Sequence, residues 1–327
     1  MPAFAHEFPF DPTYGRTREE LLRIPAPAPP ADFGAFWQSR YEAARAVETA
    51  PEVGALVEER DGVRIFEVTY LSVGEVRLGG WLVLPAEGPA EHGFVIGHGY
   101  GGRDQAGPDV PLPLPRSAAL LPCVRGMGTR GLVPEIPSVA DGHVLHGIAS
   151  RDTYVIGDCV ADLWCAASAL RELVPGLGAL GYAGGSFGGG LGALALPWDD
   201  RFGAAQLTVP TFGNHPLRLT LPCTGSGESV RTYHRTHPEV TDVLRYFDAA
   251  SAATLIEIPT LVAPALFDPA VPPPGQFAVY NALPPGSPQP HILQAGHFDH
   301  DGTETELKAL SEARAGFFAQ HLTDGEA

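Results

Sequence analysis

Several features are scarce in this 327-residue sequence. No run approaches the ~18 consecutive apolar residues that a membrane-spanning helix needs, so we expect no transmembrane segment. Basic residues are few, because 21 Lys and Arg stand against 38 Asp and Glu, which gives a formal net charge of −17. This excess of negative charge disfavours nucleic acids, anionic membrane surfaces and polyanionic substrates as partners.

The N-terminus and the cysteines bear on location. The first ten residues contain neither a basic stretch nor an apolar stretch, so we expect no signal peptide. Four cysteines are too few for a disulfide scaffold in a chain of this length, and we expect buried free thiols: Cys123, Cys159, Cys165 and Cys223. Both observations favour a cytoplasmic location.

Motifs for metals and nucleotide cofactors are also missing. His143, His146, His234 and His237 have no cysteine or carboxylate framework at ligand spacing, so we interpret them as solvated loop histidines. The glycine-rich stretch 97–103 lacks the lysine of a phosphate-binding loop and the spacing of a dinucleotide fingerprint. We therefore predict no metal and no cofactor.

The apolar content of 44% supports a sizeable core, and we predict one domain over residues 1–327. Residues 1–50 form a proline-rich arm followed by a helix that Asp32 caps. Segments 63–70 and 76–84 are predicted to form an antiparallel strand pair. The stretch from about 211 to 257 is interpreted as a lid or interface insertion.

From about residue 92, strands and helices alternate. This alternation predicts an α/β fold with a doubly wound, mostly parallel sheet and helices on both faces. The predicted strands are 93–97, 117–124, 177–183, 203–209, 258–267 and 290–294, and the predicted helices are 151–173, 190–196 and 303–321.

The sequence Gly184-Gly-Ser-Phe-Gly188 lies between a predicted strand and a predicted helix. It fits the G-x-S-x-G pattern, in which a serine occupies a sharp strand-to-helix turn. Flanking glycines suit a tight turn where a β-carbon would collide with its neighbours. An incidental serine in a glycine-rich turn is the alternative, and the other strand ends argue against it.

Ser186, Asp268 and His297 each follow a predicted strand, in the chain order of α/β-hydrolases. A serine hydroxyl attacks a carbonyl only when a base takes its proton, and His297 is the candidate base. Asp268 would fix the imidazole tautomer and stabilise the imidazolium. Asp299, close to His297, is a less suitable substitute carboxylate.

An oxyanion hole needs two backbone N–H donors. Phe187, the residue after the serine, supplies one by the construction of the turn. The second is expected from the glycine-flanked loop His98-Gly-Tyr-Gly-Gly102, at the N–H of Tyr100.

These motifs resemble the acetyl xylan esterase and cephalosporin C deacetylase family, carbohydrate esterase family 7. The resemblance runs nearly end to end. It includes Gly80-Trp-Leu82, His98-Gly-Tyr-Gly-Gly102, Arg125-Gly126, Gly147-Ile148, Asp152-Thr-Tyr154, Gly184-Gly-Ser-Phe-Gly-Gly189, Tyr246-Phe-Asp248, Asp268 with Pro272-Pro273, Tyr280-Asn281 and Gly296-His297.

The resemblance implies an α/β-hydrolase fold, a Ser186–Asp268–His297 triad and oxyanion donors on Tyr100 and Phe187. It implies the removal of acetyl groups from small sugars and related acetate esters without a cofactor. It also implies a homo-oligomer, usually a hexamer. We expect Tyr100, Arg125, Met127, Phe187 and Pro272 to form the substrate pocket.

Departures from the family bear on specificity. Phe187 and Met127 stand where the family has glutamine, Tyr154-Val-Ile-Gly157 replaces an aromatic run, and Val271 replaces a frequent cysteine. Apolar groups in place of amides predict a greasier pocket that accepts longer acyl groups. Three alternatives stay open: an esterase of broader acyl preference, an amidase or peptidase of the prolyl-oligopeptidase type, and a catalytically silent binding protein.

Overall fold

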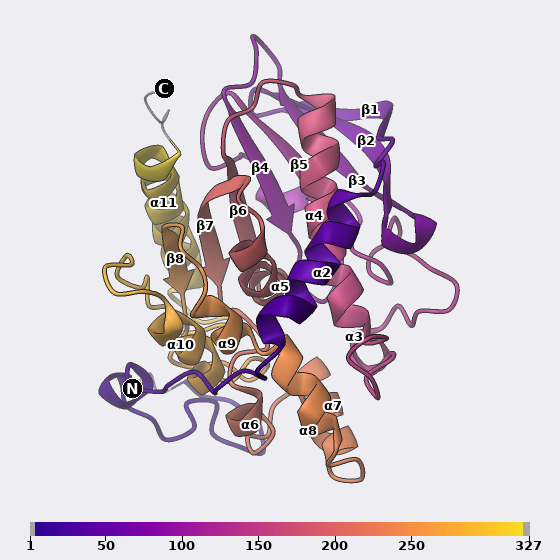
Figure 1. The fold of residues 1–327 in the computed structure, drawn as a ribbon. Helices are drawn as coiled ribbons and strands as arrows, with labels where there is room; N and C mark the ends of the chain where they lie inside the picture. Colours follow the sequence, from indigo (N-terminus) through magenta and orange to yellow (C-terminus); the bar gives the residue numbers. More distant parts are fainter. Residues whose placement is uncertain (1–3, 323–327) are drawn as a thin grey trace.

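The computed structural model describes residues 4–322 (Figure 1). Within them, eight strands form one mixed sheet in the order β1-β2-β3-β5-β4-β6-β7-β8. The strands are β1 (Glu52–Arg60), β2 (Val63–Ser72), β3 (Val76–Pro85), β4 (His92–Gly97), β5 (Ser117–Pro122), β6 (Leu180–Gly185), β7 (Phe202–Thr208) and β8 (Thr260–Ala263).

Eleven α-helices belong to the described residues. They are α1 (Arg18–Leu21), α2 (Phe33–Arg45), α3 (Ala140–His143), α4 (Val155–Leu173), α5 (Phe187–Ala195), α6 (His215–Arg218), α7 (Ser226–His234), α8 (Val240–Leu244), α9 (Ala249–Ala253), α10 (Pro273–Ala282) and α11 (Thr303–His321).

The sheet has an antiparallel part and a parallel part. Strands β1, β2 and β3 pair antiparallel, and β3 joins β5 in the same way. Strands β5, β4, β6, β7 and β8 run parallel, so their carboxyl ends share one edge. This arrangement confirms the predicted α/β class and the strand pair of 63–70 and 76–84.

Helices cover both faces of the parallel part (Figure 1). Helices α4 and α5 contact each other and one face, and α2 packs on α4. Helix α11 contacts β7 and β8 on the other face. Side chains alternate accordingly: Val95 packs in the cluster that contains Trp164, whereas Phe94 packs with Phe318. The core therefore lies on both sides of β4, β6 and β7.

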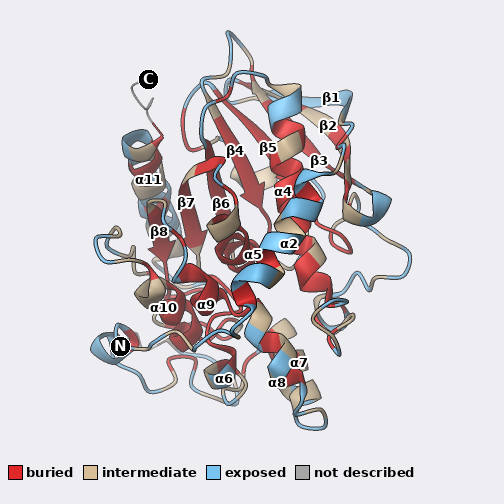
Figure 2. Cartoon of the chain, viewed as in Figure 1, coloured by how far each residue is buried: buried red, intermediate tan, exposed pale blue. Residues whose placement is uncertain are grey.

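The sequence analysis missed one strand and predicted another that is not a regular strand. Strand β1 was not predicted. Figure 2 shows it exposed at the edge of the sheet. Its residues do not alternate between buried and exposed, so the sequence lacks the apolar–polar alternation that indicates a strand. The predicted strand 290–294 makes only a single bridge, between Leu293 and Ala265. The backbone N–H groups of His291 and Leu293 still donate to the carbonyls of Val262 and Pro264, so the segment lies beside the end of β8. Pro264 and Pro290 have no N–H to donate, which keeps the pairing too short for a regular strand.

Residues 4–30 form the predicted irregular arm, with α1 as a short helical turn. Its backbone carbonyls accept hydrogen bonds from side chains far along the chain: Asn281 bonds Leu21 and Ile24, and Asn214 bonds Pro25. The carbonyl of Pro12 accepts a bond from the backbone N–H of Asp268 at 3.1 Å. The arm is thus joined to the loops at the carboxyl edge of the sheet.

Candidate active site

Ser186 stands at the turn between β6 and α5 with φ 53° and ψ −112°. A positive φ is costly for a residue with a side chain, and such strain persists only where the surroundings enforce it. Here they do. A Cβ on Gly188 would lie 2.8 Å from the carbonyl carbon of Gly97, and one on Gly184 would lie 2.7 Å from that of Gly188. The flanking glycines let β4, β6 and α5 approach closely enough to form the turn.

The structure brings Ser186, His297 and Asp268 together. His297 Nε2 lies 2.9 Å from Ser186 Oγ, and His297 Nδ1 lies 2.8 Å from Asp268 Oδ2. Asp268 can only accept when ionised, so Nδ1 donates to it and Nε2 is left to accept from the serine hydroxyl. These contacts match the geometry that a nucleophile, a base and an orienting carboxylate need in a serine hydrolase.

The Asp268 side chain is fully buried, whereas the His297 side chain is 30% exposed. Asp268 Oδ1 accepts from the backbone N–H groups of Ala270 and Val271. Gly296 permits the approach of His297, because a Cβ there would lie 2.5 Å from Asp268 Oδ2. A buried carboxylate saturated with donors stays in one orientation.

The loop after β4 is held by His98. Its Nε2 accepts from the backbone N–H of Val124 at 3.2 Å, and its Nδ1 donates to the carbonyl of Gly99 at 2.7 Å. Burial lowers the pKa of His98 to about 4, so this imidazole is neutral at physiological pH. The neutral ring fixes the loop that carries Tyr100.

Tyr100 and Phe187, the two predicted oxyanion residues, are in contact. Their rings stack with centroids 4.0 Å apart and planes 17° apart. The N–H of Phe187 opens helix α5, where the first amides have no partner within the helix. Neither this amide nor that of Tyr100 bonds a backbone carbonyl in residues 4–322. Both donors are available, and their role as an oxyanion hole stays a prediction.

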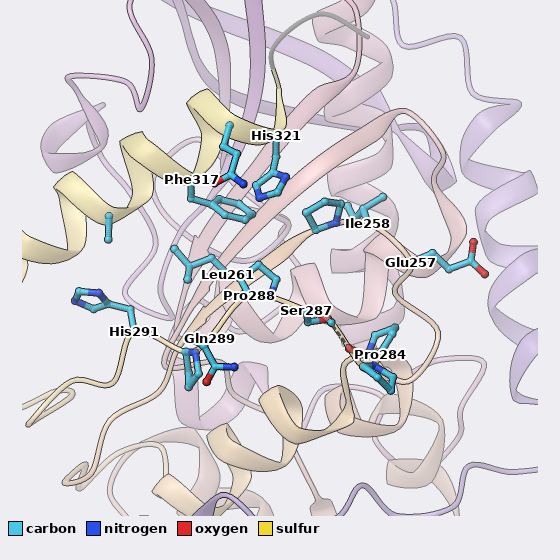
Figure 3. Close-up of a pocket in the computed structure, with 16 residues that line it drawn as sticks. Glu257, Ile258, Leu261, Pro284, Ser287, Pro288, Gln289, His291, Phe317 and His321 are labelled. Atoms are coloured by element: carbon cyan, nitrogen blue, oxygen red, sulfur yellow. Dashed lines mark hydrogen bonds between the residues drawn. The ribbon is translucent and has the colours of Figure 1, made fainter.

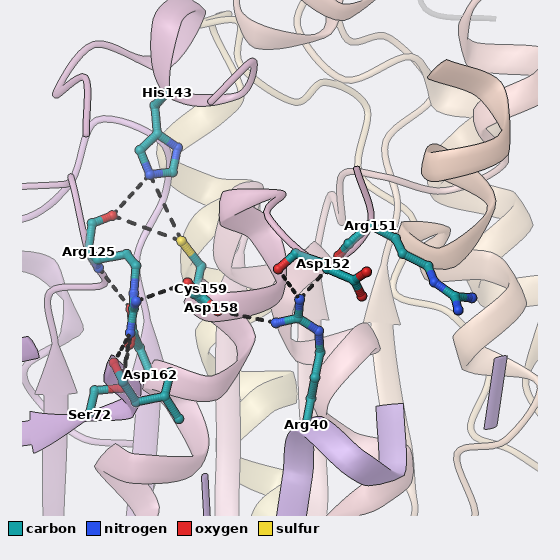
Figure 4. A network of polar contacts seen from close by, with 10 residues as sticks. Arg40, Ser72, Arg125, His143, Arg151, Asp152, Asp158, Cys159 and Asp162 are labelled. Carbon is teal, nitrogen blue, oxygen red and sulfur yellow. Dashed lines mark hydrogen bonds and ion pairs between the residues drawn. The ribbon is translucent and has the colours of Figure 1, made fainter. Parts of the chain in front are cut away.

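His143 is not a solvated loop histidine, and that prediction is wrong: its side chain is buried. The carbonyl of Arg125 can only accept, so His143 Nε2 donates to it at 3.0 Å (Figure 4). His143 Nδ1 then accepts from the Tyr100 hydroxyl at 2.9 Å. Burial lowers the pKa of His143 to about 4, which keeps this bond in place across the working range of a hydrolase.

Arg125 anchors this chain of contacts. Its guanidinium and its backbone N–H bind the fully buried Asp162 of α4, with Nη2 2.7 Å from Oδ1 (Figure 4). A buried charge needs such a partner. Asp162, Arg125, His143 and Tyr100 therefore connect α4 to the loop beside Ser186, and no sequence pattern indicated this connection.

A cavity of about 290 Å³ opens at Ser186 and His297. Tyr100 and Val271 are the larger apolar residues of its lining, and the others are small or polar: Gly99, Gly101, Ala140, Thr211, Thr224, Gly225, Ser226 and Ala270. Of the predicted pocket residues, only Tyr100 lines it. Arg125, Met127, Phe187 and Pro272 are buried and do not line it.

Phe187 and Met127 do not line the cavity at Ser186, so they cannot make its walls more apolar, as the sequence analysis expected. Phe187 turns into the core against Tyr100, and Met127 belongs to the core cluster around α4 and α5. A second cavity of about 440 Å³ also contacts Ser186, and its lining is glycine-rich with Arg103, Asp104 and Asp109. The apolar lining of the first cavity comes from Tyr100, Ala140, Ala270 and Val271, and that of the second from Pro108 and Val209, so neither depends on Phe187 or Met127.

The largest of the described cavities, about 750 Å³, lies elsewhere (Figure 3). It is formed by the proline-rich loop after α10 and by Phe317 and His321 of α11, and it contains no triad residue. Among the described residues, no group of three or more His, Cys, Asp or Glu is placed to hold a metal ion. No helix in that range combines the length and apolar character needed to cross a membrane.

A family model described as acetyl xylan esterase (AXE1) matches residues 22–304. The chain belongs to this family. As an acetyl xylan esterase family member it is a serine esterase, a carboxylic ester hydrolase of the class that acts on acetylated carbohydrates. This confirms the resemblance, the function and the enzyme class that the sequence predicted.

Solved structures agree with this family on the fold. An acetyl xylan esterase from Paenibacillus sp. R4 gives a TM-score of 0.77 at 24% identity, covering 91% of this chain and 99% of that one. Acetyl xylan esterase 1 from Thermoanaerobacterium sp. JW/SL YS485 gives 0.77 at 19% identity, covering 93% and 99%. An acylaminoacyl peptidase from Pyrococcus horikoshii gives 0.59 at 14% identity, covering 86% and 44%. All three share the α/β-hydrolase fold.

Proposed function

We propose that this esterase removes acetyl groups from small acetylated carbohydrates, with Ser186 as nucleophile, His297 as general base and acid, and Asp268 as the carboxylate that orients His297. The observation that carries the proposal is the continuous contact from Ser186 Oγ through the imidazole to Asp268 Oδ2, at 2.9 and 2.8 Å. Hydrolysis of p-nitrophenyl acetate is the direct test.

The reaction would proceed in two halves. Ser186 Oγ attacks the ester carbonyl while His297 Nε2 takes its proton, and the backbone N–H groups of Tyr100 and Phe187 bind the developing oxyanion. The imidazolium then protonates the leaving alcohol and leaves an acetyl-serine. Water, deprotonated by His297, releases acetate and restores Ser186.

The alcohol must depart where His297 can protonate it, which assigns it to the cavity that Ser186 and His297 share. Thr224 and Gly225 line this cavity and also a neighbouring one of about 700 Å³. That second cavity carries the hydroxyls of Ser229, Thr232 and Thr236 and the ring of Tyr233. Hydroxyl groups and one aromatic ring suit a sugar better than an alkyl chain.

We expect the rate to fall steeply with acyl length. Each methylene buried against apolar groups would contribute about 0.8 kcal/mol. The cavity that Ser186 and His297 share is only about 290 Å³, and its apolar lining is limited to Tyr100, Ala140, Ala270 and Val271, so few methylenes of a long acyl chain could be buried there. The values of kcat/KM on p-nitrophenyl acetate, butyrate and octanoate measure this, with the triad variant Ser186→Ala as blank. A profile that stays level to octanoate would favour the alternative of broader acyl preference.

The activity should also depend on the protonation of His297. Burial lowers its pKa, but the hydrogen bond and the negative charge of Asp268 outweigh burial and raise it above the usual 6.5. Only the neutral imidazole accepts a proton from Ser186, so kcat/KM should be lost as the pH falls through a pKa above 6.5. Rates on p-nitrophenyl acetate from pH 5 to 9 test this, and a level rate down to pH 5.5 would contradict it.

Two alternatives from other classes have distinct signatures. A silent binding protein would not react with a fluorophosphonate probe, whereas an active serine would. An amidase or peptidase would cleave N-acetyl amides as well as esters. We favour the esterase because of the family to which the chain belongs.

The same proposal covers organisation and setting. Residues 1–327 act as one domain, with 1–50 as arm and helix, and the insertion 211–257 covers the reaction cavity because Thr211 and residues 224–226 line it. We also propose that the protein is cytoplasmic. By family resemblance, we expect it to form a homo-oligomer, a hexamer. Deacetylation of cephalosporin C is a further candidate activity of this site.

A further inference from the structure

Gln276 lies in the first turns of α10 and is fully buried. A buried primary amide needs an acceptor for each N–H and a donor for its carbonyl. Gln276 has all of them. Its Oε1 accepts from the backbone N–H of Ala265 at 2.7 Å, and its Nε2 donates to the carbonyl of Val271 at 2.6 Å and to Asp268 Oδ2 at 2.9 Å. One side chain thus joins the segment after β8 to the loop that carries Asp268.

Asp268 Oδ2 has two donors, Gln276 Nε2 and His297 Nδ1. Oδ1 is occupied by the amides of Ala270 and Val271. Within residues 4–322, no lysine or arginine forms an ion pair with this carboxylate. Gln276 is therefore the side-chain partner that fixes the rotation of the carboxylate and the position of Oδ2.

We propose that Gln276 is a positioning residue of the triad: it holds Asp268 in the orientation that His297 requires, and its amide competes with the imidazole for Oδ2. The inference rests on the proposed function of Ser186, Asp268 and His297. A hydrogen bond donated to a carboxylate oxygen draws negative charge from it. The imidazolium formed during the reaction is consequently less stabilised than it would be by a carboxylate without Gln276.

The surroundings make this effect measurable. The charges of Asp268 and Arg218 act both on Tyr14 of the arm and on Cys223 of the loop before α7. Burial raises the pKa of both, so both are neutral where His297 titrates. Neither group changes its charge on the acidic limb of the pH profile, where the imidazole titrates.

The test replaces the amide with an apolar group of similar size, in Gln276→Leu. Loss of the competing bond should move the midpoint of the acidic limb of kcat/KM upward by about half a pH unit or more. Loss of positioning should lower kcat/KM at the plateau by about tenfold. Rates on p-nitrophenyl acetate are divided by the fraction of enzyme that a fluorophosphonate labels, so misfolded protein does not enter the result.

Gln206→Leu is the matched control. Gln206 is equally buried on β7, and its amide bonds Thr208 Oγ1 and no triad group. It should lose thermal stability without any shift in the midpoint. Gln276→Met is a second variant of similar size, in case the leucine variant fails to fold. Its thioether cannot donate a hydrogen bond to Oδ2, so it should also raise the midpoint.

An unchanged or lowered midpoint in both folded Gln276 variants would overturn the inference and reduce Gln276 to a structural residue. Failure of the proposed function looks different, since the unaltered protein would then neither hydrolyse the ester nor react with the fluorophosphonate.

Discussion

Replacing Ser186 with alanine should lower kcat on p-nitrophenyl acetate by roughly 10⁵-fold or more, because loss of a triad nucleophile removes the acyl-enzyme route. Alanine keeps the β-carbon at this positive φ, so the turn between β6 and α5 should survive. Initial rates and fluorophosphonate labelling of the purified variant measure the change. Thermal unfolding should stay within a few degrees of the unaltered protein.

Ser287→Ala is a suitable control, because its hydroxyl bonds the carbonyl of Pro284 in the distant cavity of Figure 3. It should hydrolyse the ester at the normal rate. If Ser186→Ala retained more than about a tenth of the activity, another group would be the nucleophile and the triad assignment would be wrong.

Asp268→Asn should lower kcat/KM by about 10³- to 10⁴-fold. The asparagine carbonyl can take the place of Oδ1, where two backbone amides donate. Its NH₂ would then face His297 Nδ1 and Gln276 Nε2, which are both donors now. The imidazole would respond by moving its hydrogen to Nε2, where it can no longer accept the proton of Ser186.

Asp299→Asn provides the comparison within the same loop. Asp299 is exposed and close to His297 in sequence, and it is the carboxylate that a substitute role would require. We expect Asp299→Asn to keep full kcat/KM on p-nitrophenyl acetate and the same midpoint on the acidic limb of its pH profile. A loss as large as that of Asp268→Asn would transfer the orienting role to Asp299.

The grouping of Ser186, Asp268 and His297 was predictable because Ser186 follows β6 and Asp268 follows β8, whose carboxyl ends share one edge of the parallel sheet. His297 follows a segment that bridges the end of β8 through Leu293 and Ala265 and therefore reaches the same edge. The same regularity gave the fold class. Strand β1 was not predicted because it lies at the edge of the sheet with exposed side chains. Its sequence therefore has no alternation of apolar and polar residues.

The pocket walls could not be predicted, because the direction of a side chain depends on its neighbours in space. Phe187 follows the nucleophile, but its ring fills the space beside Tyr100 and His143 instead of facing the cavity. His143 gave no signal, since its partners are a carbonyl 18 residues away and a hydroxyl 43 residues away. The contact of Gln276 with Asp268 could not be predicted for the same reason, because only the folded chain brings this α10 side chain to the carboxylate.

The contact between Pro12 and Asp268 has a consequence for defining the minimal enzyme. The shared family region begins at residue 22, yet the carbonyl that receives the backbone N–H of Asp268 belongs to residue 12. The region that the family shares thus begins ten residues after a residue that holds the Asp268 loop in place. A polypeptide trimmed to the shared region would keep every triad side chain, but the loop that presents the carboxylate would have lost one of its anchors.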